Sequence, residues 1–430
     1  MTRLMTKVLS DDPLIRSMSY QSVLSAFGEG AFLTGSAVYF TQIVGLSPAQ
    51  VGLGLTIGGV VVFCASVPLG RLADAVGTRR TWILGSLLEA LLFGSWFLVE
   101  GFAAYVAVTI ALELAASWMR SGRNAYRFEV FPRETRVRSL AYMRASRNVG
   151  YTLGAGAGGL ALAAGSDGPI MAIPLVTAVI LLLNTAWITR MPRLSREAEA
   201  HAEAGDTALE AAVAGSRRSD PRAALRNRPF ILTSTLSGIL STHQVLLNVV
   251  VPLWLVAETD APRVLLAWLF GTNTVMAVAL QVATARGVSD VGTSLRAVRR
   301  GAFFFVLSCG ILLVTHDTIG WVTIALMWIG HITVTFAELY DSAGAWGLQA
   351  ELSDPDRRGE YQGVSQLGFI LGSVWAPAAY TFLAMEVGTW GWITIGALVV
   401  LAAAAIAPAA RAAERHLVRV GAPGQAVAAG

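Results

Sequence analysis

The sequence predicts an all-α membrane protein with twelve transmembrane helices in two pseudo-symmetric bundles of six. Three observations support this fold class: the apolar composition, the spacing of the basic residues and an internal repeat. Of the 430 residues, 54% are hydrophobic and only 14% are charged, whereas a soluble domain carries roughly 25% charged residues. Most side chains therefore have lipid as their solvent.

The lysines and arginines divide the chain into six apolar stretches of 54, 39, 42, 57, 56 and 52 residues. One crossing needs about 20 apolar residues, so each stretch fits two crossings and a short turn. The basic clusters are at 3–16, 71–80, 120–147, 190–228, 286–300, 357–358 and 411–419. The predicted spans are 18–44, 50–70, 81–99, 102–119, 141–164, 169–189, 230–256, 263–285, 301–316, 319–340, 362–385 and 388–407.

The orientation follows from the same basic residues. All but Arg263 of the 32 lie on one side of the predicted membrane, and the positive-inside rule makes that side cytoplasmic. Both termini are then cytoplasmic, and we expect a multi-pass protein of the cytoplasmic (inner) membrane. The N-terminus has no apolar core followed by small residues, so a cleavable signal peptide is not expected.

An internal repeat of about 220 residues supports the division into halves. Three residue pairs share nearly one offset: Asp74 with Asp290 (216 residues), Glu113 with Glu338 (225) and Pro132 with Pro355 (223). The predicted domains are a six-helix bundle at 1–189, a cytoplasmic linker at 190–228 and a second six-helix bundle at 229–430. Six-plus-six repeats are a transporter architecture, with the substrate path at the interface between the repeats.

No motif in the sequence indicates an enzyme. There is no Walker loop, and the glycine-rich run at 150–159 does not follow a strand, so no nucleotide cofactor is expected. Cys64 and Cys309 lie in apolar runs, and no cluster of His, Cys and carboxylate residues has metal-ligand spacing. The net charge of +4 is modest and comes from short loops, so we expect no nucleic-acid partner.

The loop between spans 2 and 3 carries the most specific motif. The pattern G-x-L-x-D-R-x-G-R-R is matched at Gly70, Leu72, Asp74, Gly77, Arg79 and Arg80, with departures at Ala75 and Thr78. On this motif, and over essentially its whole length, the chain resembles the major facilitator superfamily, in particular its drug/proton antiporters. The resemblance implies that this loop latches the two halves together. The glycines permit a tight turn, and Asp74 can accept hydrogen bonds at a helix N-terminus.

Span 5 resembles a second motif of the same family. The exporter pattern G-x-x-x-G-P-x-x-G-G is matched at Gly150, Gly154, Gly158 and Gly159, with Ala155 in place of the proline. The resemblance implies export. The alternative is a packing face of small residues that does not bear on transport direction. The missing proline weakens the export inference because it removes the expected kink.

Charged residues inside the spans are site candidates, because a carboxylate near the bilayer centre is unfavourable unless it is protonated, paired or in a wet cavity. Glu29 is the only charge between Arg16 and Arg71, and we predict that it couples protons or recognises the substrate. Its alternative role is a structural hydrogen bond to a neighbouring helix.

The remaining candidates for proton coupling or substrate binding lie in spans 4, 7 and 10 or just beyond their ends, and these spans line the cavity in the family. They are Glu113, Arg120, Arg123, His243, Glu338 and Asp341. The two arginines have positive-inside anchoring as their alternative role. For the carboxylates and the histidine the alternative is hydrogen bonding between packed helices.

The leading functional hypothesis is a proton-coupled exporter, an antiporter of small amphipathic or drug-like molecules that works by alternating access as a monomer. One alternative is a proton-coupled importer or uniporter of a small metabolite. The other is a non-transporting membrane receptor or assembly partner on the same fold. The expected partners are a small-molecule substrate, protons and the lipid bilayer.

Overall fold

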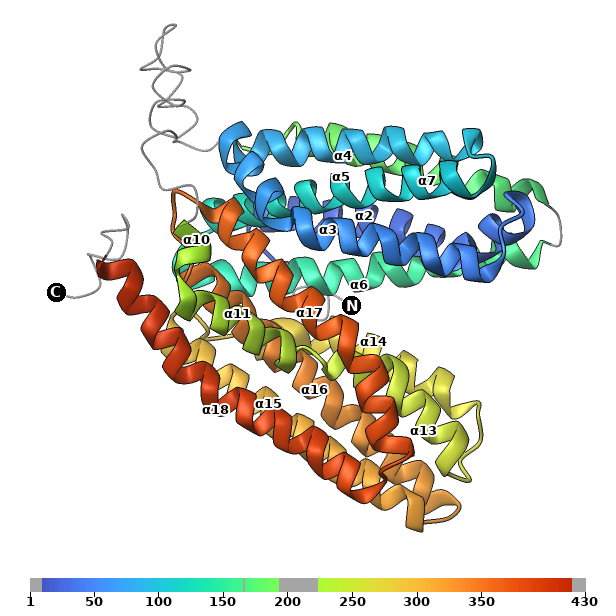
Figure 1. Ribbon diagram of the computed structural model, residues 1–430, viewed down its shortest axis with the longest axis vertical. Helices are drawn as coiled ribbons and strands as arrows, with labels where there is room; N and C mark the ends of the chain where they lie inside the picture. The colour runs from blue at the N-terminus through green and yellow to red at the C-terminus, as the bar shows by residue number, and fades with distance from the viewer. Residues whose placement is uncertain (1–9, 165–166, 193–222, 420–430) are drawn as a thin grey trace, which may run out of the picture. The chain divides into compact units, whose positions relative to one another are not determined.

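The computed structural model describes residues 10–164, 167–192 and 223–419, and within these ranges the chain is helical and contains no strand (Figure 1). Each of the twelve predicted spans falls on a helix or on a run of consecutive helices. Nine of the described helical segments are long and apolar enough to cross a membrane. Most of the predicted linker at 190–228 lies outside the described residues.

The first half of the chain forms α2 (Pro13–Val38), η1 (Tyr39–Ile43), α3 (Pro48–Val76), α4 (Thr78–Gly94), η2 (Ser95–Leu98), α5 (Gly101–Val130), α6 (Arg133–Ala163) and α7 (Asp167–Ile188). The second half forms α10 (Ala223–Arg226), α11 (Arg228–Leu240), α12 (His243–Val245), η3 (Leu246–Val250), α13 (Val251–Glu258), α14 (Leu265–Thr284), α15 (Val291–Val314), η4 (Thr315–Asp317), α16 (Trp321–Glu351), α17 (Arg358–Met385) and α18 (Thr389–Arg419). The segments η1 and η3 are π-helices in the first helical run of each half.

Two predicted loops are much shorter than their basic clusters suggested. The cluster at 120–147 is almost entirely helical, because α5 continues to Val130 and α6 begins at Arg133. The predicted loop at 70–80 reduces to Gly77, where α3 ends and α4 begins. Charged side chains do not stop a helix, so their position indicates the membrane boundary rather than the helix end.

The described residues form two compact units. Unit 1 takes residues 10–131, 142–192 and 356–363, and unit 2 takes residues 132–141, 224–355 and 364–419. The start of α6 therefore belongs to unit 2, and the start of α17 belongs to unit 1. The first half of the sequence thus contributes the start of α6 to unit 2, and the second half contributes the start of α17 to unit 1.

In unit 1, α3 and α4 pack on α5, and α7 packs on α2 and α4. An aromatic core closes the end of unit 1 where α2 leads through η1 to α3. There the Phe40 ring meets Trp96 at 4.7 Å and Tyr105 at 4.8 Å between centroids, in edge-to-face geometry. The Tyr39 hydroxyl donates to the Trp96 carbonyl at 3.2 Å. This end of unit 1 is therefore tightly packed.

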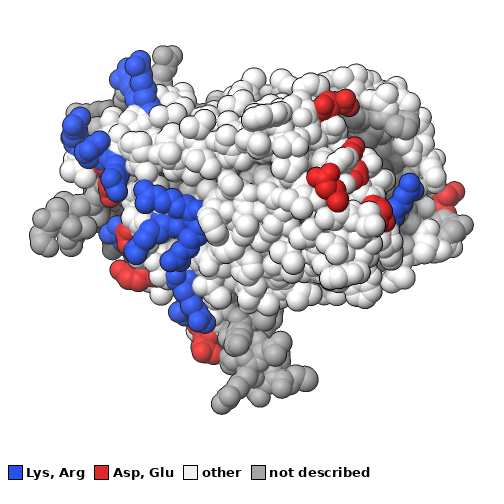
Figure 2. Space-filling view, turned by 90° about the horizontal axis from the view of Figure 1, so that it is seen from below, with Lys and Arg blue, Asp and Glu red and all other residues white. Residues whose placement is uncertain are grey.

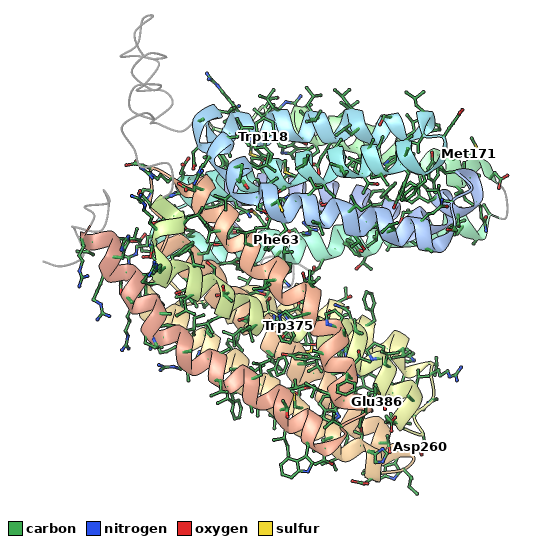
Figure 3. The ribbon with its side chains drawn as sticks, viewed as in Figure 1. Phe63, Trp118, Met171, Asp260, Trp375 and Glu386 are labelled. Carbon is green, nitrogen blue, oxygen red and sulfur yellow. The ribbon has the colours of Figure 1, made fainter. Side chains whose placement is uncertain are left out.

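In unit 2, α15 packs on α16 and α18, and α11 packs on α18. Figure 2 shows most basic side chains of the viewed face gathered at one end, with acidic side chains at both ends. Asp260 and Glu386, labelled in Figure 3, lie at the same end of unit 2. Asp260 there accepts a hydrogen bond from the Gly320 backbone N–H at 2.6 Å, which ties two of the inter-helix turns together.

The outer faces of both units are apolar. Leu160 in unit 1 is 75% exposed and Leu401 in unit 2 is 67% exposed, and Met171 on α7, labelled in Figure 3, is also exposed. A water-soluble monomer rarely exposes large apolar patches. Together with the nine apolar helices, these faces indicate contact with lipid.

Candidate functional site

Asp74, in the last turn of α3, accepts a hydrogen bond at each carboxylate oxygen. The Gly359 backbone N–H donates to Oδ1 at 2.6 Å, and the Glu360 backbone N–H donates to Oδ2 at 2.8 Å. Both donors belong to the first turn of α17, where backbone N–H groups have no partners within their own helix. The helix dipole also favours a carboxylate at this position. Asp74 therefore caps α17 from within unit 1.

Arg71 and Gly70 complete this junction, which we call the Asp74 junction. Arg71 Nε and Nη2 donate to Glu360 Oε1 at 3.1 and 3.0 Å, and the Glu360 side chain is nearly fully buried. A Cβ atom on Gly70 would overlap the Gly359 carbonyl oxygen, and a Cβ on Gly359 would overlap that of Gly70. Two glycines thus let α3 and α17 approach closely enough for Asp74 to reach the N–H groups.

The rest of the predicted latch motif serves the turn and α7. Gly77 has φ of 94°, a conformation that favours glycine. Arg79 donates to the carbonyl oxygens of Thr189 at 2.6 Å and Met191 at 3.2 Å, just beyond the end of α7, where a cation complements the helix dipole. Arg80 lies exposed on the first turn of α4.

Glu29 on α2 forms an ion pair with Arg147 on α6. Arg147 Nη2 lies 2.5 Å from Glu29 Oε2, and the Ser25 hydroxyl lies 3.5 Å from Glu29 Oε1. The side chains of Glu29 and Arg147 are 36% and 45% exposed. The predicted isolation of Glu29 along α2 is correct, and its partner comes from another helix.

The glycines of span 5 explain why Arg147 reaches Glu29. A Cβ atom on Gly150, Gly154 or Gly158 would overlap a backbone carbonyl oxygen of α2, whereas one on Gly159 would meet nothing within 4 Å. Three of the four motif glycines therefore bring α6 against α2. Arg147 precedes Gly150 by one helical turn and so lies on the same face.

The span 4 candidates all lie on α5 in unit 1. Arg120 Nη2 lies 3.9 Å from Glu113 Oε2, and both side chains are about one-third or more exposed. Arg123 is only 9% exposed. Glu29, Arg147 and Arg120 are among the charges that act on it most strongly. The structure thus brings Glu29, Arg120 and Arg123 into one charged region.

The other candidates form a separate polar group in unit 2. His243 Nε2 lies 3.2 Å from Asp341 Oδ2, and both side chains are buried. Asn273 donates from Nδ2 to Glu338 Oε2 at 3.0 Å. Asp341 and Glu338 lie on one face of α16. His243 begins the short helix α12, which leads directly into the π-helix η3, so a local irregularity of a kind common at functional sites adjoins this group.

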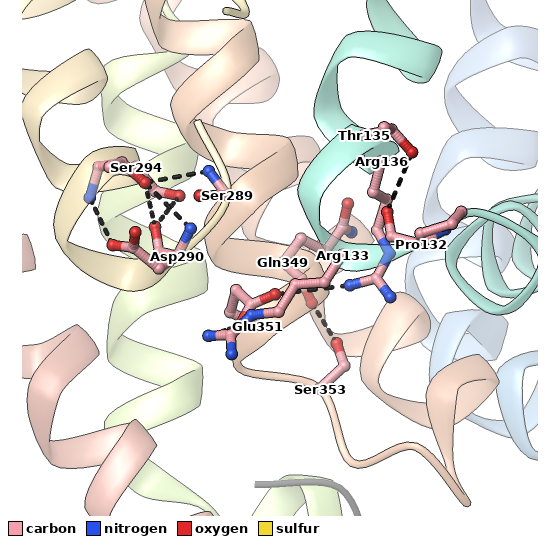
Figure 4. A network of polar contacts seen from close by, with 11 residues as sticks. Pro132, Arg133, Thr135, Arg136, Ser289, Asp290, Ser294, Gln349, Glu351 and Ser353 are labelled. Carbon is pink, nitrogen blue, oxygen red and sulfur yellow. Dashed lines mark hydrogen bonds and ion pairs between the residues drawn. The ribbon is translucent and has the colours of Figure 1, made fainter. Parts of the chain in front are cut away.

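A second junction, which we call the Glu351 junction, lies in unit 2 at the start of α6 (Figure 4). Glu351 accepts Arg133 Nη2 at 2.5 Å on Oε2 and Arg136 Nη1 at 3.5 Å on Oε1. Nearby, Asp290 caps α15: its Oδ1 accepts the Thr293 N–H at 2.8 Å, and Thr293 Oγ1 accepts the Asp290 N–H at 3.0 Å. Burial raises the pKa of Asp290, but the hydrogen bonds from Thr293 and Gly292 outweigh it and hold the pKa below its ordinary value of 3.8.

Sequence reasoning missed four residues of these sites: Arg71, Arg147, Glu351 and Glu360. Arg71 and Arg147 were counted as basic residues of cytoplasmic loops. The spacing of Arg147 from the span 5 glycines was a usable signal. Gly150, Gly154 and Gly158 follow Arg147 by three, seven and eleven residues, and these separations place all four residues on one helix face. Glu351 and Glu360 gave no such signal, since their partners lie more than 200 residues away.

Comparisons with known proteins agree with this architecture. The family model described as Major Facilitator Superfamily matches residues 19–340. No curated protein matches the sequence. Among solved structures, the chain is similar to the proton:xylose symporter XylE of the major facilitator superfamily, with 14% identity and a TM-score of 0.69 over 91% of this chain and 94% of that chain.

Two further solved structures are similar. A bacterial homologue of the iron transporter ferroportin is 16% identical, with a TM-score of 0.68 over 93% of this chain and 100% of that chain. The human organic anion transporter MFSD10 is 15% identical, with a TM-score of 0.65 over 92% of this chain and 100% of that chain. At these identities the similarities establish the fold alone. The family model covers most of the sequence, and the chain therefore belongs to the Major Facilitator Superfamily of membrane transporters, which are not enzymes.

Proposed function

We propose that the chain is a proton-coupled exporter of small amphipathic molecules that works by alternating access as a monomer. The observation that carries this proposal is the ion pair of Glu29 with Arg147. A proton bound to Glu29 removes its negative charge and weakens the pair, and loss of the proton restores it. Protonation can therefore bias α2 and α6 between two arrangements, which is what coupling requires.

The Asp74 junction supports the alternating-access part of the proposal. Two charge-assisted hydrogen bonds and an ion pair between the half-buried Arg71 and the buried Glu360 join the end of α3 to the start of α17. Each bond of this kind contributes about 1.5–3 kcal/mol. A junction of this strength can hold one of two conformations, and its rupture would then accompany the transport step.

We propose that the basic ends of the helices are cytoplasmic in the cell membrane. The support is the distribution of the basic residues, 31 of 32 of which fall in the clusters at the two termini and between predicted pairs of spans. Single cysteines introduced at the 258–263 turn should react with an impermeant thiol reagent added outside cells, and cysteines in the 190–228 segment should not. The reverse labelling pattern would contradict the orientation.

Import is the second candidate function, and α6 is the observation that favours it. The helix runs from Arg133 to Ala163 and contains no proline, so the kink of the exporter motif has no source at Ala155. Export and import predict opposite directions of substrate movement for the same proton gradient. The group of His243 and Asp341 in unit 2 is a further candidate for proton binding under either function.

The test is transport in proteoliposomes with an imposed pH gradient, with a panel of cationic, neutral and anionic amphipathic dyes. An exporter should move the amphipathic dye across the membrane in the direction opposite to the protons. A separate pH indicator enclosed in the proteoliposomes should report the proton flux. Movement of dye and protons in the same direction would identify an importer. No transport of any dye, with binding retained, would favour a receptor.

The Glu29→Gln variant tests the coupling residue. It should abolish gradient-driven accumulation and retain exchange of dye across the membrane, because glutamine keeps the shape of a protonated glutamate. Glu100→Gln is the matched control, since Glu100 lies exposed at the start of α5 and should leave transport unchanged. Normal accumulation by Glu29→Gln, at equal expression, would remove Glu29 from the proposal.

A further inference from the structure

Unit 1 contains a group of seven charged side chains with more positive than negative charge, which we call the arginine cluster. It is defined by the mutual electrostatic action of its members. The members are Arg120, Arg123, Arg127, Arg147, Glu29, Glu89 and Glu113. The cluster therefore holds four positive and three negative charges.

Three of the four arginines have partners in unit 1. Arg147 is paired with Glu29 at 2.5 Å. Arg127 Nη2 lies 3.4 Å from the Ser22 hydroxyl, and its guanidinium lies over the Trp82 ring at 5.9 Å from the centroid. Arg120 approaches Glu113 at 3.9 Å, which is too long for a hydrogen bond. The Arg120 pair is therefore loose.

Arg123 is the arginine of the cluster that no direct polar contact with a described residue holds, although the charges of Glu29 and Glu89 act on it from beyond ion-pair distance. Among the described residues it forms neither an ion pair nor a hydrogen bond, and its Nε atom is shielded from solvent without an acceptor. The residue is 9% exposed. A buried guanidinium that forms neither an ion pair nor a hydrogen bond is unfavourable. A structural role alone does not account for such a residue, because an uncharged side chain would fill the same space without that cost.

We infer that Arg123 and Arg120 bind an anionic group, such as a carboxylate or sulfonate, on the transported molecule. The two arginines are three residues apart and lie on one face of α5. The planar guanidinium presents several donors in a geometry that matches a carboxylate. Arg120 is 34% exposed at its side chain, so a ligand can approach the buried Arg123 past it. This inference rests on the proposed function, and it narrows the amphipathic substrate to an anionic one.

The site also accounts for the loose pair of Arg120 with Glu113. An incoming anion can displace a carboxylate held at 3.9 Å at little cost, whereas Glu29 remains bound to Arg147. The released Glu113 then lies free on the same helix. Substrate binding at Arg123 and proton binding at Glu29 are thereby assigned to neighbouring but different groups of one cluster.

The experiment measures equilibrium binding to the purified full-length protein in detergent, with three probes that share one aromatic body. They are naphthalene-1-acetate, naphthalene-1-acetamide and 2-(1-naphthyl)ethylamine. The carboxylate should bind at least about tenfold more tightly than the amide or the amine, as loss of a charge-assisted hydrogen bond implies. Equal or weaker binding of the carboxylate, or no binding of any probe, would overturn the inference.

Variants locate the binding at the two arginines. Arg120→Gln and Arg123→Gln should each weaken carboxylate binding by about tenfold and leave amide binding unchanged. Arg123→Lys keeps the charge and guards against misfolding of the buried variant, and it should retain part of the preference. Arg190→Gln is the matched control, because Arg190 lies exposed after α7 in the same unit. An undiminished carboxylate preference in both Arg120→Gln and Arg123→Gln would contradict the assignment.

Two further outcomes separate this inference from the proposed function. A carboxylate preference in a protein that transports nothing would support the anion site and contradict the transporter. Gradient-driven transport of cationic or neutral dyes alone would support the transporter and contradict the anion site. Phosphatidylglycerol added to the detergent tests a lipid headgroup as the occupant: displacement of the bound naphthalene-1-acetate would overturn the substrate assignment.

Discussion

The regions around Asp74 and Asp290 occupy corresponding positions in the two repeats and use an aspartate in different ways. Asp74 accepts N–H groups of α17, a helix that lies 285 residues further along the chain. Asp290 accepts the N–H of Thr293 and caps its own helix, α15. Both carboxylates satisfy unpaired N–H groups at a helix start. The first joins distant segments of the chain, and the second stabilises one helix locally.

The same contrast appears in the charged residues beside them. At the Asp74 junction, Arg71 pairs with Glu360 at the start of α17. In unit 2, the start of α6 supplies Arg133 and Arg136, and Glu351 at the end of α16 receives both. The two positions therefore share an aspartate but differ in what joins the helix starts. An ion-pair network replaces the carboxylate cap in unit 2.

The largest difference between the two aspartates should appear in transport. Asp74→Asn removes one of the two acceptors, because the amide NH₂ group cannot accept an N–H bond, and transport should fall by about tenfold or more. Asp290→Asn should leave transport nearly unchanged, since asparagine is as good a cap as aspartate. Initial rates in proteoliposomes, normalised to the amount of folded protein, measure both. Equal losses of transport rate in the two variants would contradict the difference in role between Asp74 and Asp290.

The close approach of α3 to α17 gives the next largest effect. Gly70→Ala places a methyl group against the Gly359 carbonyl, and overpacking of this kind costs about 1–3 kcal/mol. We expect a lower unfolding temperature or a loss of transport as the junction opens. Gly59→Ala on the same helix is the control, because a Cβ there meets nothing within 4 Å. Wild-type behaviour of Gly70→Ala would show that α17 can shift without consequence.

The smallest expected effect is the loss of the local cap at Asp290. Asp290→Ala should lower the free energy of unfolding by about 1 kcal/mol and leave transport intact. Because the folded protein holds the pKa of Asp290 below 3.8, the ionised cap stabilises above that pH and is lost as the pH falls through the lower folded value. Thermal unfolding followed by circular dichroism should therefore show a lower unfolding temperature for Asp290→Ala than for the wild-type protein at pH 6, and this difference should narrow below pH 4. A difference that persists unchanged to pH 3 would mean that charge does not matter to this cap.

The sequence by itself determined the fold class, the family and the positions of the twelve helical spans. These features depend on properties that are local or periodic: apolar stretches of membrane length, basic residues between them and glycines at fixed spacing. The repeat also placed Asp74 opposite Asp290. It did not reveal that the two act differently, because a capping aspartate has the same local sequence requirements whichever helix it caps.

Only the tertiary structure decided the partners. Glu29 and Arg147, Asp74 and α17, and Arg133 and Glu351 are separated by 118, 285 and 218 residues, and nothing local in the sequence connects them. The structure also showed which candidates lie together within each unit: Glu29, Arg120 and Arg123 share one charged region in unit 1, and His243 pairs with Asp341 in unit 2. It likewise identified Arg123 as a buried arginine that forms neither an ion pair nor a hydrogen bond among the described residues. The physical reason is that an ionised group is stabilised by whichever charges and donors the packed helices bring within a few ångströms, and helix packing depends on the whole chain.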